Sequence, residues 1–374
     1  GRPYIVAPSI DEDLIRDFTD GKLGGPQFVF SEGTSLANET LSDFNLTEEV
    51  YAGYAMANLD FGAASLTTGL RVEHTKLDIT GYLLEDGTDV VPISGQQDYT
   101  DWLPSVVLRI EPRDDVLLRL AYSRSVGRPQ FSNLSPGGEV EIISDDEISV
   151  SSGNPALKPY RADALDASAE WYFAPGGLLS VGAFAKWIKD PIFTQDYTLE
   201  NASFLGETYD RIYFSQKLNA ESAQIMGLEA AYQQQFTFLP GLLSGLGVNL
   251  NVTLIDAELQ DPARGDIPFP EQSKLLWGAQ LFYQKGIVEA SVAYHHTGRA
   301  MISAGDTELT DQYNDDLRRL DAKVSVDITR NVRVFAEAQN LTDEPTRQYQ
   351  GGNRDWMTQN ERYGRTYFVG ASLR

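Results

Sequence analysis

The stretch RRLDAKVSVDITRNVRVFAEAQ, residues 318–339, alternates apolar and polar side chains in two successive runs. One face of the two runs is apolar and carries Ala322, Val324, Val326, Ile328, Val332, Val334, Ala336 and Ala338. The other face is mostly polar and carries Asp321, Lys323, Ser325, Asp327, Arg333, Phe335, Glu337 and Gln339. A period of two residues is typical of β-strands. The stretch therefore predicts two strands that each separate an apolar medium from a polar one.

A third alternating segment follows the polar residues 342–360 and ends the sequence. Its odd positions carry Tyr363, Arg365, Tyr367, Val369, Ala371 and Leu373. A short turn, then a long loop and a final strand, is the order in which outer-membrane β-barrels end, because their periplasmic turns are short and their extracellular loops are long. This order favours a transmembrane barrel.

The same hairpin unit recurs along the chain from residue 46. Paired strands are expected near residues 51–61 and 66–75, 102–111 and 116–125, 161–173 and 178–188, 223–238 and 246–259, and 274–283 and 287–297. Connections of about two to seven residues alternate with connections of about eleven to thirty-three. Soluble sandwiches lack such alternation. We therefore predict an all-β fold, an antiparallel up-and-down transmembrane β-barrel with about 13 strands in this chain.

Two features of the predicted strands support a wide, membrane-spanning barrel. Their polar faces hold charged and amide side chains, which need a broad, water-filled lumen. Trp102, Trp171, Trp187 and Trp277 are expected near strand ends, where they would form aromatic belts at the two membrane surfaces.

Composition narrows the function classes further. The formal net charge of -24 argues against nucleic acid as a partner. The absence of cysteine excludes disulfides and thiolate metal sites. No apolar run approaches the ~20 residues that a membrane helix needs, so any spanning must be done by strands.

Residues 1–43 are expected to form an extracellular loop region with a short helix at 9–18, and residues 44–374 the barrel strands. An odd number of strands is unusual, because a single-chain barrel normally has an even number with both termini in the periplasm. The strand count therefore predicts the C-terminal part of a larger barrel.

Four motifs carry a resemblance to a known family: YSRSVGRP at residues 122–129, GNPALKPYRAD at 153–163, NLTD at 340–343 and YGRTY at 363–367. In this order they resemble TonB-dependent outer-membrane receptors, nearest to the branch found in Xanthomonas and Caulobacter relatives. The resemblance implies a 22-stranded barrel in the outer membrane of a Gram-negative bacterium, closed by an N-terminal plug. It also implies outer-membrane lipid, a small-molecule solute and, through an N-terminal TonB box, the TonB complex as partners. Neither plug nor TonB box is visible in this sequence.

Two of these motifs also have a structural interpretation. In residues 154–159, Pro155 and Pro159 fix the backbone φ angle and would end a loop before a strand begins. We favour this role over ligand contact. Residues 340–343 are typical of a strand end followed by an Asx-type turn.

The sequence offers little catalytic or metal-binding chemistry. His295 is expected to face the lumen and His296 outward, and the three histidines lack zinc-type spacing. No G-x-S-x-G motif or phosphate-binding glycine loop occurs. The acidic residues 145–147 and 306–316 could hold Ca²⁺, although we favour solvated loop charge. We predict no cofactor, no metal and no enzymatic activity. An outer-membrane hydrolase stays open, because a barrel can bring a distant serine and histidine together.

Aromatic and amide residues in the long loops are the candidates for ligand binding. They are Phe131, Asn133, Tyr197, Tyr209, Tyr313, Tyr349, Asn353 and Trp356. Sugars bind on aromatic faces, and Trp356 is flanked by Arg354 and Asp355. Relatives in the family often import glycan fragments, so the resemblance favours energy-coupled uptake of a carbohydrate. A ferric siderophore is the alternative within the family, and a passive porin is the alternative if no plug exists.

Overall fold

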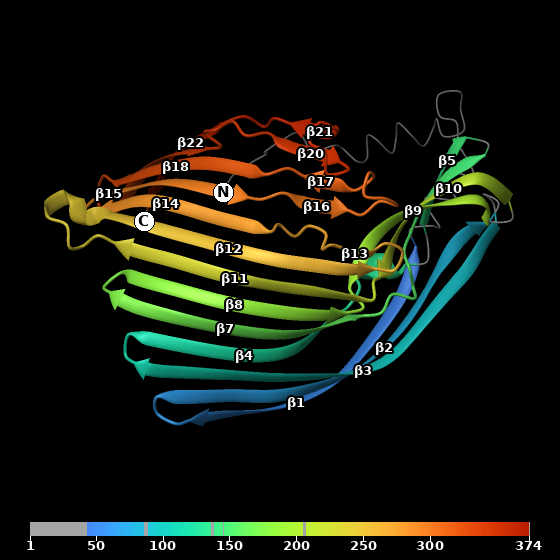
Figure 1. Ribbon diagram of the computed structural model, residues 1–374, viewed down its shortest axis with the longest axis horizontal. Helices are drawn as coiled ribbons and strands as arrows, with labels where there is room; N and C mark the ends of the chain where they lie inside the picture. Colours follow the sequence, from blue (N-terminus) through green and yellow to red (C-terminus); the bar gives the residue numbers. More distant parts are fainter. Residues whose placement is uncertain (1–42, 86–88, 136–137, 145, 205–206, 374) are drawn as a thin grey trace, which may run out of the picture.

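The computed structural model describes residues 43–85, 89–135, 138–144, 146–204 and 207–373. Long strands lie side by side in one curved sheet, as Figure 1 shows. Their order in space is β1-β2-β3-β4-β7-β8-β11-β12-β14-β15-β18-β19-β22, which is also their order along the chain. None of the described helices has the length and apolar character needed to cross a membrane.

The strands of this sheet have the following bounds: β1 (Phe44–Asp60), β2 (Ala64–Glu85), β3 (Asp89–Arg113), β4 (Val116–Gly127), β7 (Tyr160–Ala174), β8 (Gly177–Lys189), β11 (Ser222–Gln235), β12 (Leu246–Asp261), β14 (Leu275–Lys285), β15 (Val288–Thr297), β18 (Leu317–Asp327), β19 (Val332–Gln339) and β22 (Thr366–Leu373). A further short strand, β13 (Gly265–Pro268), pairs with β12, and the turn between β11 and β12 contains the 3-10 helix η1 (Gly241–Gly245).

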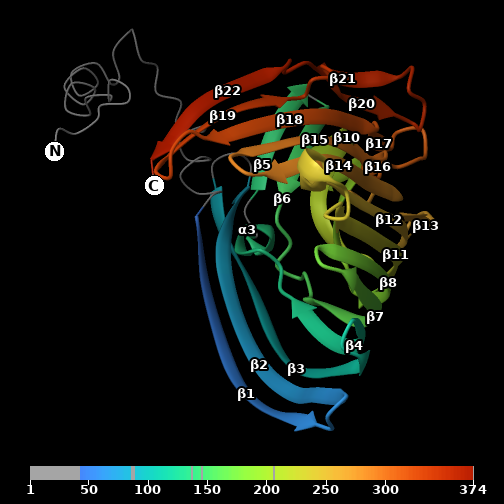
Figure 2. The same cartoon turned by 90° about the vertical axis from the view of Figure 1, so that its left-hand side faces the viewer.

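The predicted thirteen-strand, up-and-down arrangement is confirmed. Each strand of the path pairs antiparallel with the next strand of the path. Seen end-on in Figure 2, the sheet curves like part of a cylinder. Among the described residues the strand order runs as an open path from β1 to β22, which form its two edges.

The closing run forms the predicted strands. In β18 and β19, Val324 lies opposite Ala336 and Ser325 opposite Phe335, so apolar residues share one face and polar residues largely the other. The turn between them is longer than expected, because β18 ends at Asp327 instead of Thr329. The Thr329 hydroxyl accepts the backbone N–H of Val332 at 3.1 Å, which stabilises this turn.

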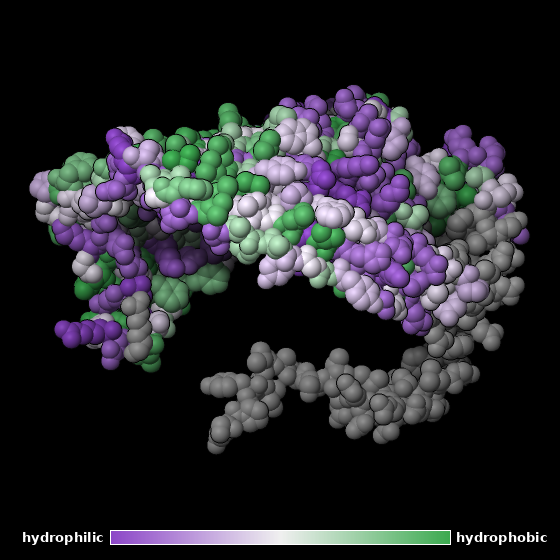
Figure 3. Space-filling view, turned by 90° about the horizontal axis from the view of Figure 1, so that it is seen from below, coloured by the Kyte–Doolittle hydropathy of each residue, from purple (hydrophilic) through white to green (hydrophobic). Residues whose placement is uncertain are grey.

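The two faces of the sheet differ in chemistry as predicted. On the concave face, the Asn249 amide donates to Gln280 at 2.8 Å and Lys323 lies 3.8 Å from Glu337. The outward face exposes large apolar side chains, including Leu228 at 58% and Val369 at 87%. Apolar side chains gather near the end with short turns and polar ones near the other end, as Figure 3 shows. Such a band is suited to hydrocarbon.

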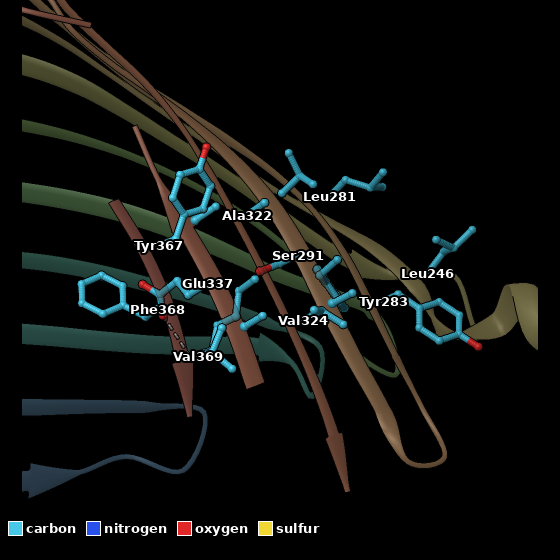
Figure 4. Close-up of a pocket in the computed structure, with 16 residues that line it drawn as sticks. Leu246, Leu281, Tyr283, Ser291, Ala322, Val324, Glu337, Tyr367, Phe368 and Val369 are labelled. Carbon is cyan, nitrogen blue, oxygen red and sulfur yellow. Dashed lines mark ion pairs between the residues drawn. The ribbon is translucent and has the colours of Figure 1, made fainter. Parts of the chain in front are cut away.

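A shallow apolar cavity of about 410 Å³ lies among these side chains on β12, β14, β15, β18, β19 and β22 (Figure 4). It is lined by residues such as Leu246, Leu281, Val292, Val324 and Val369. Such grooves between side chains are where lipid chains would pack.

The tryptophans give the height of the apolar band. Trp171 and Trp187 lie on the outward face, and Trp187 is opposite Asp163, eight residues along β7 from Trp171. At ~3.3 Å per residue this separation is about 26 Å along the strand, or about 20 Å for a strand tilted by about 40°. The spacing fits the apolar band of an outer-membrane barrel. Trp102 and Trp277 are exposed on the same face.

The long connections differ from the sequence-based expectation, because they contain strands instead of loops. Residues 128–160 and 189–220 hold the short helix α3 (Phe131–Leu134) and four strands, β5 (Gly138–Ser144), β6 (Glu147–Ser152), β9 (Ile192–Phe204) and β10 (Glu207–Asn219). Residues 298–317 and 342–360 hold β16 (Ala300–Ser303), β17 (Gln312–Asn314), β20 (Thr346–Gln350) and most of β21 (Met357–Glu361). Six of these strands have three to seven residues, whereas β9 and β10 have 13 each.

Two further differences concern the N-terminal half. Strands β2 and β3 have 22 and 25 residues, so they extend well beyond the expected ranges and past the apolar band. The loop region expected at 1–43, with its helix at 9–18, lies outside the described residues except for Asp43.

Glycines opposite aromatic rings are a repeated packing feature of the concave face. Gly227 lies opposite Phe184 and Gly247 opposite Phe282. A Cβ on either glycine would meet the ring at 2.3 Å or 2.2 Å. Each ring therefore lies flat over the neighbouring backbone, as in the aromatic covering of glycines in other sheets.

We expect Gly227→Ala to destabilise the barrel by about 1–3 kcal/mol, because the new methyl group collides with Phe184 and the Leu254 carbonyl. Heating the complete protein and following its folded band on a gel would measure this. Gly182→Ala is the matched control, since its methyl group would meet its nearest neighbour at an ordinary 3.6 Å. Equal melting of the two variants would contradict the packing role.

Candidate ligand-binding site

Two small sheets lie toward the end of the barrel with long connections, the first at the right of Figure 1 and the second in its upper centre. The first sheet has the order β5-β6-β10-β9, and the second β16-β17-β20-β21. An isolated bridge between Gln195 and Ala304 links the segments that carry them. All eight candidate residues lie in these sheets, in their turns or in α3.

The first sheet has its own small core of Ile148, Val150 and Ile212. Tyr197 of β9 stacks on Phe214 of β10 with ring centres 5.1 Å apart, and burial raises the pKa of Tyr197. Tyr209 packs beside the core. Both tyrosines therefore take part in the packing of this sheet. Strand β10 pairs parallel with β6, unlike the barrel strands.

Helix α3 lies within the curve of the barrel sheet (Figure 2). Its Leu134 is buried with Leu77 and Ile79 of β2. Phe131 at its start is 48% exposed, and Asn133 is half-buried with its carbonyl accepting the Asn154 N–H at 2.6 Å. This short helix thus holds one exposed aromatic ring on the inner side of the sheet.

The residues 154–159 fix the connection that carries α3. The Asn154 amide donates to the Lys217 carbonyl at 3.2 Å, and the Gln97 amide donates to the carbonyls of Pro155 and Leu157 at 3.1 and 2.7 Å. Leu157 is fully buried. These contacts support the structural interpretation of the motif.

The second sheet carries the other four candidates. Tyr313 of β17 stacks on Tyr349 of β20 at 5.5 Å, and burial raises the pKa of Tyr313. Tyr349 is only 2% exposed, so its ring is covered. Asn353 and Trp356 lie in the turn between β20 and β21, where Trp356 is 49% exposed.

A buried ion pair holds the second sheet to the rim of the barrel. Arg264, beside β13, donates to both carboxylate oxygens of Asp311 at 2.5 and 3.0 Å, and also to the Gly305 carbonyl. Asp311 is 2% exposed and accepts the Gly305 N–H at 3.0 Å. The expectation of solvated charge across residues 306–316 is therefore wrong for Asp311, because a paired arginine allows a carboxylate to be buried.

The histidines take the predicted directions on their strands. His295 is opposite Gly278 on the concave face, and His296 is opposite Trp277 on the outward face. The His74 ring contacts the Thr100 hydroxyl at 3.1 Å and lies 3.6 Å from Asp98. The part of the chain that the structure describes contains no group of three or more metal-binding side chains.

The barrel strands of this chain match a known protein family. Residues 14–341 match the family described as TonB dependent receptor-like, beta-barrel. The chain belongs to this family. Members of the family lie in the outer membrane of Gram-negative bacteria, and this is the location of this TonB-dependent receptor barrel.

Solved structures with a similar fold include a copper transporter and receptors for iron chelates. The copper transporter OprC has a TM-score of 0.62 with 16% identity, over 88% of this chain and 48% of that chain. The ferric-catecholate import receptor Fiu from E. coli K12 has a TM-score of 0.63 with 14% identity, over 88% and 45%. The ferric enterobactin receptor PfeA from Pseudomonas aeruginosa, in complex with enterobactin, has a TM-score of 0.58 with 14% identity, over 88% and 54%.

This receptor barrel thus spans about half the length of the solved structures that it matches. A search of curated proteins gave no match.

Two arginines from the family-like motifs act as clamps in this receptor barrel. Arg128 donates to Glu73 at 2.6 Å and to Thr75 at 3.0 Å, and Arg161 donates to Asp101 at 2.5 Å. Both carboxylates are nearly buried. The sequence places both arginines in motifs but does not predict their ion pairs, because the partner carboxylates lie 55 and 60 residues away along the chain.

The structure does not bring the eight predicted residues into one site. Phe131 and Asn133 share α3, Tyr197 and Tyr209 share the first sheet, and the remaining four share the second sheet. Phe131 and Trp356 keep exposed rings. The neighbours Gly352 and Arg354 line a cavity with the outward-facing His296, so the Trp356 turn lies toward the outer rim. Phe131 is therefore the stronger candidate for contact with a ligand in the lumen.

We expect Asp311→Ala to loosen the second sheet, because Arg264 would lose its buried partner at a cost of about 3–5 kcal/mol. Limited proteolysis should then cut within residues 300–316 and 342–361 while the barrel strands stay intact. The control is Asp306→Ala, which removes an exposed carboxylate from the same connection. Equally slow cleavage of both variants would argue against this anchoring role.

Proposed function

We propose that the complete protein is an energy-coupled importer, which binds a scarce solute outside the cell and releases it inward when TonB acts. The observation that supports this proposal is the combination of the family match with a polar concave face covered by two sheets. Binding by the covering sheets and the lumen, followed by movement of a plug, needs no covalent chemistry.

The open sheet supports a larger barrel around these strands. In hydrocarbon, each unpaired backbone N–H or C=O costs several kcal/mol, so membrane-spanning sheets close into barrels. We infer that β1 and β22 pair with strands beyond the described residues, in a barrel of about 22 strands with a plugged lumen. In this arrangement the chain is the C-terminal part of the barrel.

For the substrate class we favour a carbohydrate or glycan fragment. Phe131 offers an exposed aromatic ring on α3, the helix that lies within the curve of the barrel sheet, and Asn133 is a neighbouring amide. Sugars bind to such faces with a few directed hydrogen bonds. The net charge of -24 disfavours an anionic iron chelate. A ferric siderophore is the second candidate, because the similar structures include ferric-catecholate and enterobactin receptors.

Uptake in a deletion strain tests the function directly. Labelled glycans and iron chelates are supplied separately, with and without an uncoupler that removes the proton gradient. The proposal predicts that deletion and uncoupling both abolish uptake of one glycan class. Loss of iron-chelate uptake alone would favour the siderophore receptor, and uptake that survives uncoupling would favour a passive pore.

For Phe131→Ala we expect about tenfold weaker binding of the glycan that is taken up, equivalent to ~1.4 kcal/mol. The aromatic face would be lost while Leu134 still anchors α3. Equilibrium binding to the purified complete protein measures the change. Phe238→Ala serves as the matched control, since this ring is 70% exposed at the opposite end of the barrel. Unchanged affinity in Phe131→Ala would remove Phe131 from the site.

A further inference from the structure

A second cavity, of about 700 Å³, lies on the outer side of the barrel near its extracellular end. Its lining includes the outward-facing His296 of β15 and Arg318 of β18, which are opposite each other in the strand register. Met301 of β16 and Arg354 of the β20–β21 turn line it from the second small sheet. The β15 and β18 side of this cavity therefore lies on the outward face of the barrel wall. Met301 packs in one buried cluster with the inward-facing Ala223 and Leu259, so the cavity is at the extracellular rim.

The cavity begins where the aromatic belt ends. His296 lies beside Trp277 with ring centres 6.0 Å apart, and Trp277 packs against Tyr294 at 5.1 Å. Aromatic side chains of this kind lie at the level of lipid headgroups. A cavity lined by His296 and Leu275 is thus placed where the hydrocarbon of the outer leaflet meets its headgroups.

The charged lining is mainly cationic. It consists of Lys274, Arg299, Arg318 and Arg354 together with one carboxylate, Asp316. The chain as a whole has a net charge of -24, so four cationic side chains around one cavity form a region of opposite charge.

Asp316 organises these cations without neutralising them. It accepts hydrogen bonds from Arg318 at 3.2 Å, from Arg354 at 2.9 Å and from the Arg299 backbone N–H at 2.9 Å. Arg354 also pairs with Asp315 at 2.8 Å, and Lys274 lies 3.7 Å from Asp256. Four cations against three carboxylates leave an excess of positive charge.

Donors also remain available to an anion. A guanidinium has five N–H donors, and these contacts use only part of them. Among the described residues, the Arg299 side chain forms no ion pair with a carboxylate.

We propose that this outer cavity binds the phosphate-bearing headgroup of an outer-leaflet lipid. Arginine forks match the geometry of phosphate oxygens, and lysine adds a point charge. The lipid chains would continue down the apolar outward face, whereas the headgroup occupies the cationic cavity. Basic pockets on membrane proteins recognise anionic headgroups in this way.

Native mass spectrometry of the complete protein in neutral detergent tests the proposal. Phosphatidic acid is the probe, phosphatidylcholine is the zwitterionic control, and inorganic phosphate is added as competitor. We expect the Arg299→Gln, Arg318→Gln double variant to bind phosphatidic acid at least about tenfold more weakly. The matched control is Arg319→Gln, Arg330→Gln, because Arg319 is next to Arg318 on the opposite face of β18 and Arg330 lies at the other end of the barrel.

The results separate the outcomes. Specific loss in the double variant, with little competition by equimolar phosphate, supports a lipid headgroup site. Equal binding by both double variants, or equal binding of phosphatidylcholine, overturns the proposal. Displacement of the lipid by equimolar phosphate overturns the lipid assignment in favour of a free anion. If the double variant fails to fold, Lys274→Gln provides the measurement, since this side chain is 75% exposed, and unchanged binding by it would overturn the proposal.

Discussion

The need to pair every backbone polar group inside hydrocarbon governs this structure. Lipid offers no hydrogen bonds, so a strand can cross the membrane only between two other strands. Among the described residues, the eleven strands between β1 and β22 meet this requirement, because each pairs with the strand before it and the strand after it in the barrel path. Polar side chains can then face a wet interior and apolar ones the lipid, which is the alternation visible from Asp321 to Leu373.

Above the membrane, water removes that requirement and the chain uses other interactions. The second small sheet is held there by a buried carboxylate, Asp311, which pairs with Arg264. A similar pair, Asp101 of β3 with Arg161 of β7, joins two strands of the barrel near the same end. A buried pair of this kind adds limited net stability but fixes geometry, because loss of either partner leaves an isolated charge. Arg264 therefore sets how the second small sheet sits on the barrel.

The sequence predicted the membrane-spanning strands well because side-chain polarity alternates every second residue, according to whether a side chain faces lipid or water. Val324 and Lys323 could be assigned to faces without knowledge of their partners. The second small sheet escaped detection because β16, β17 and β20 have only 4, 3 and 5 residues. Candidate ligand residues were harder still. Tyr349 and Trp356 look alike as loop aromatics, and only the fold shows that one is buried by Tyr313 and the other exposed.

The parallel pairing of β10 with β6 has a consequence for assembly. Arg211 reaches Glu147 across 64 residues of chain, and β7 and β8 lie between them in sequence. Closing so long a segment costs entropy that local hairpins avoid, so non-local pairings form late. The β7–β8 hairpin can form from its tight turn outward. The pairing of β6 with β10 can form only after the whole intervening segment has crossed the membrane. The sheet that contains β6 and β10 is therefore completed after the barrel strands next to it have inserted into the membrane.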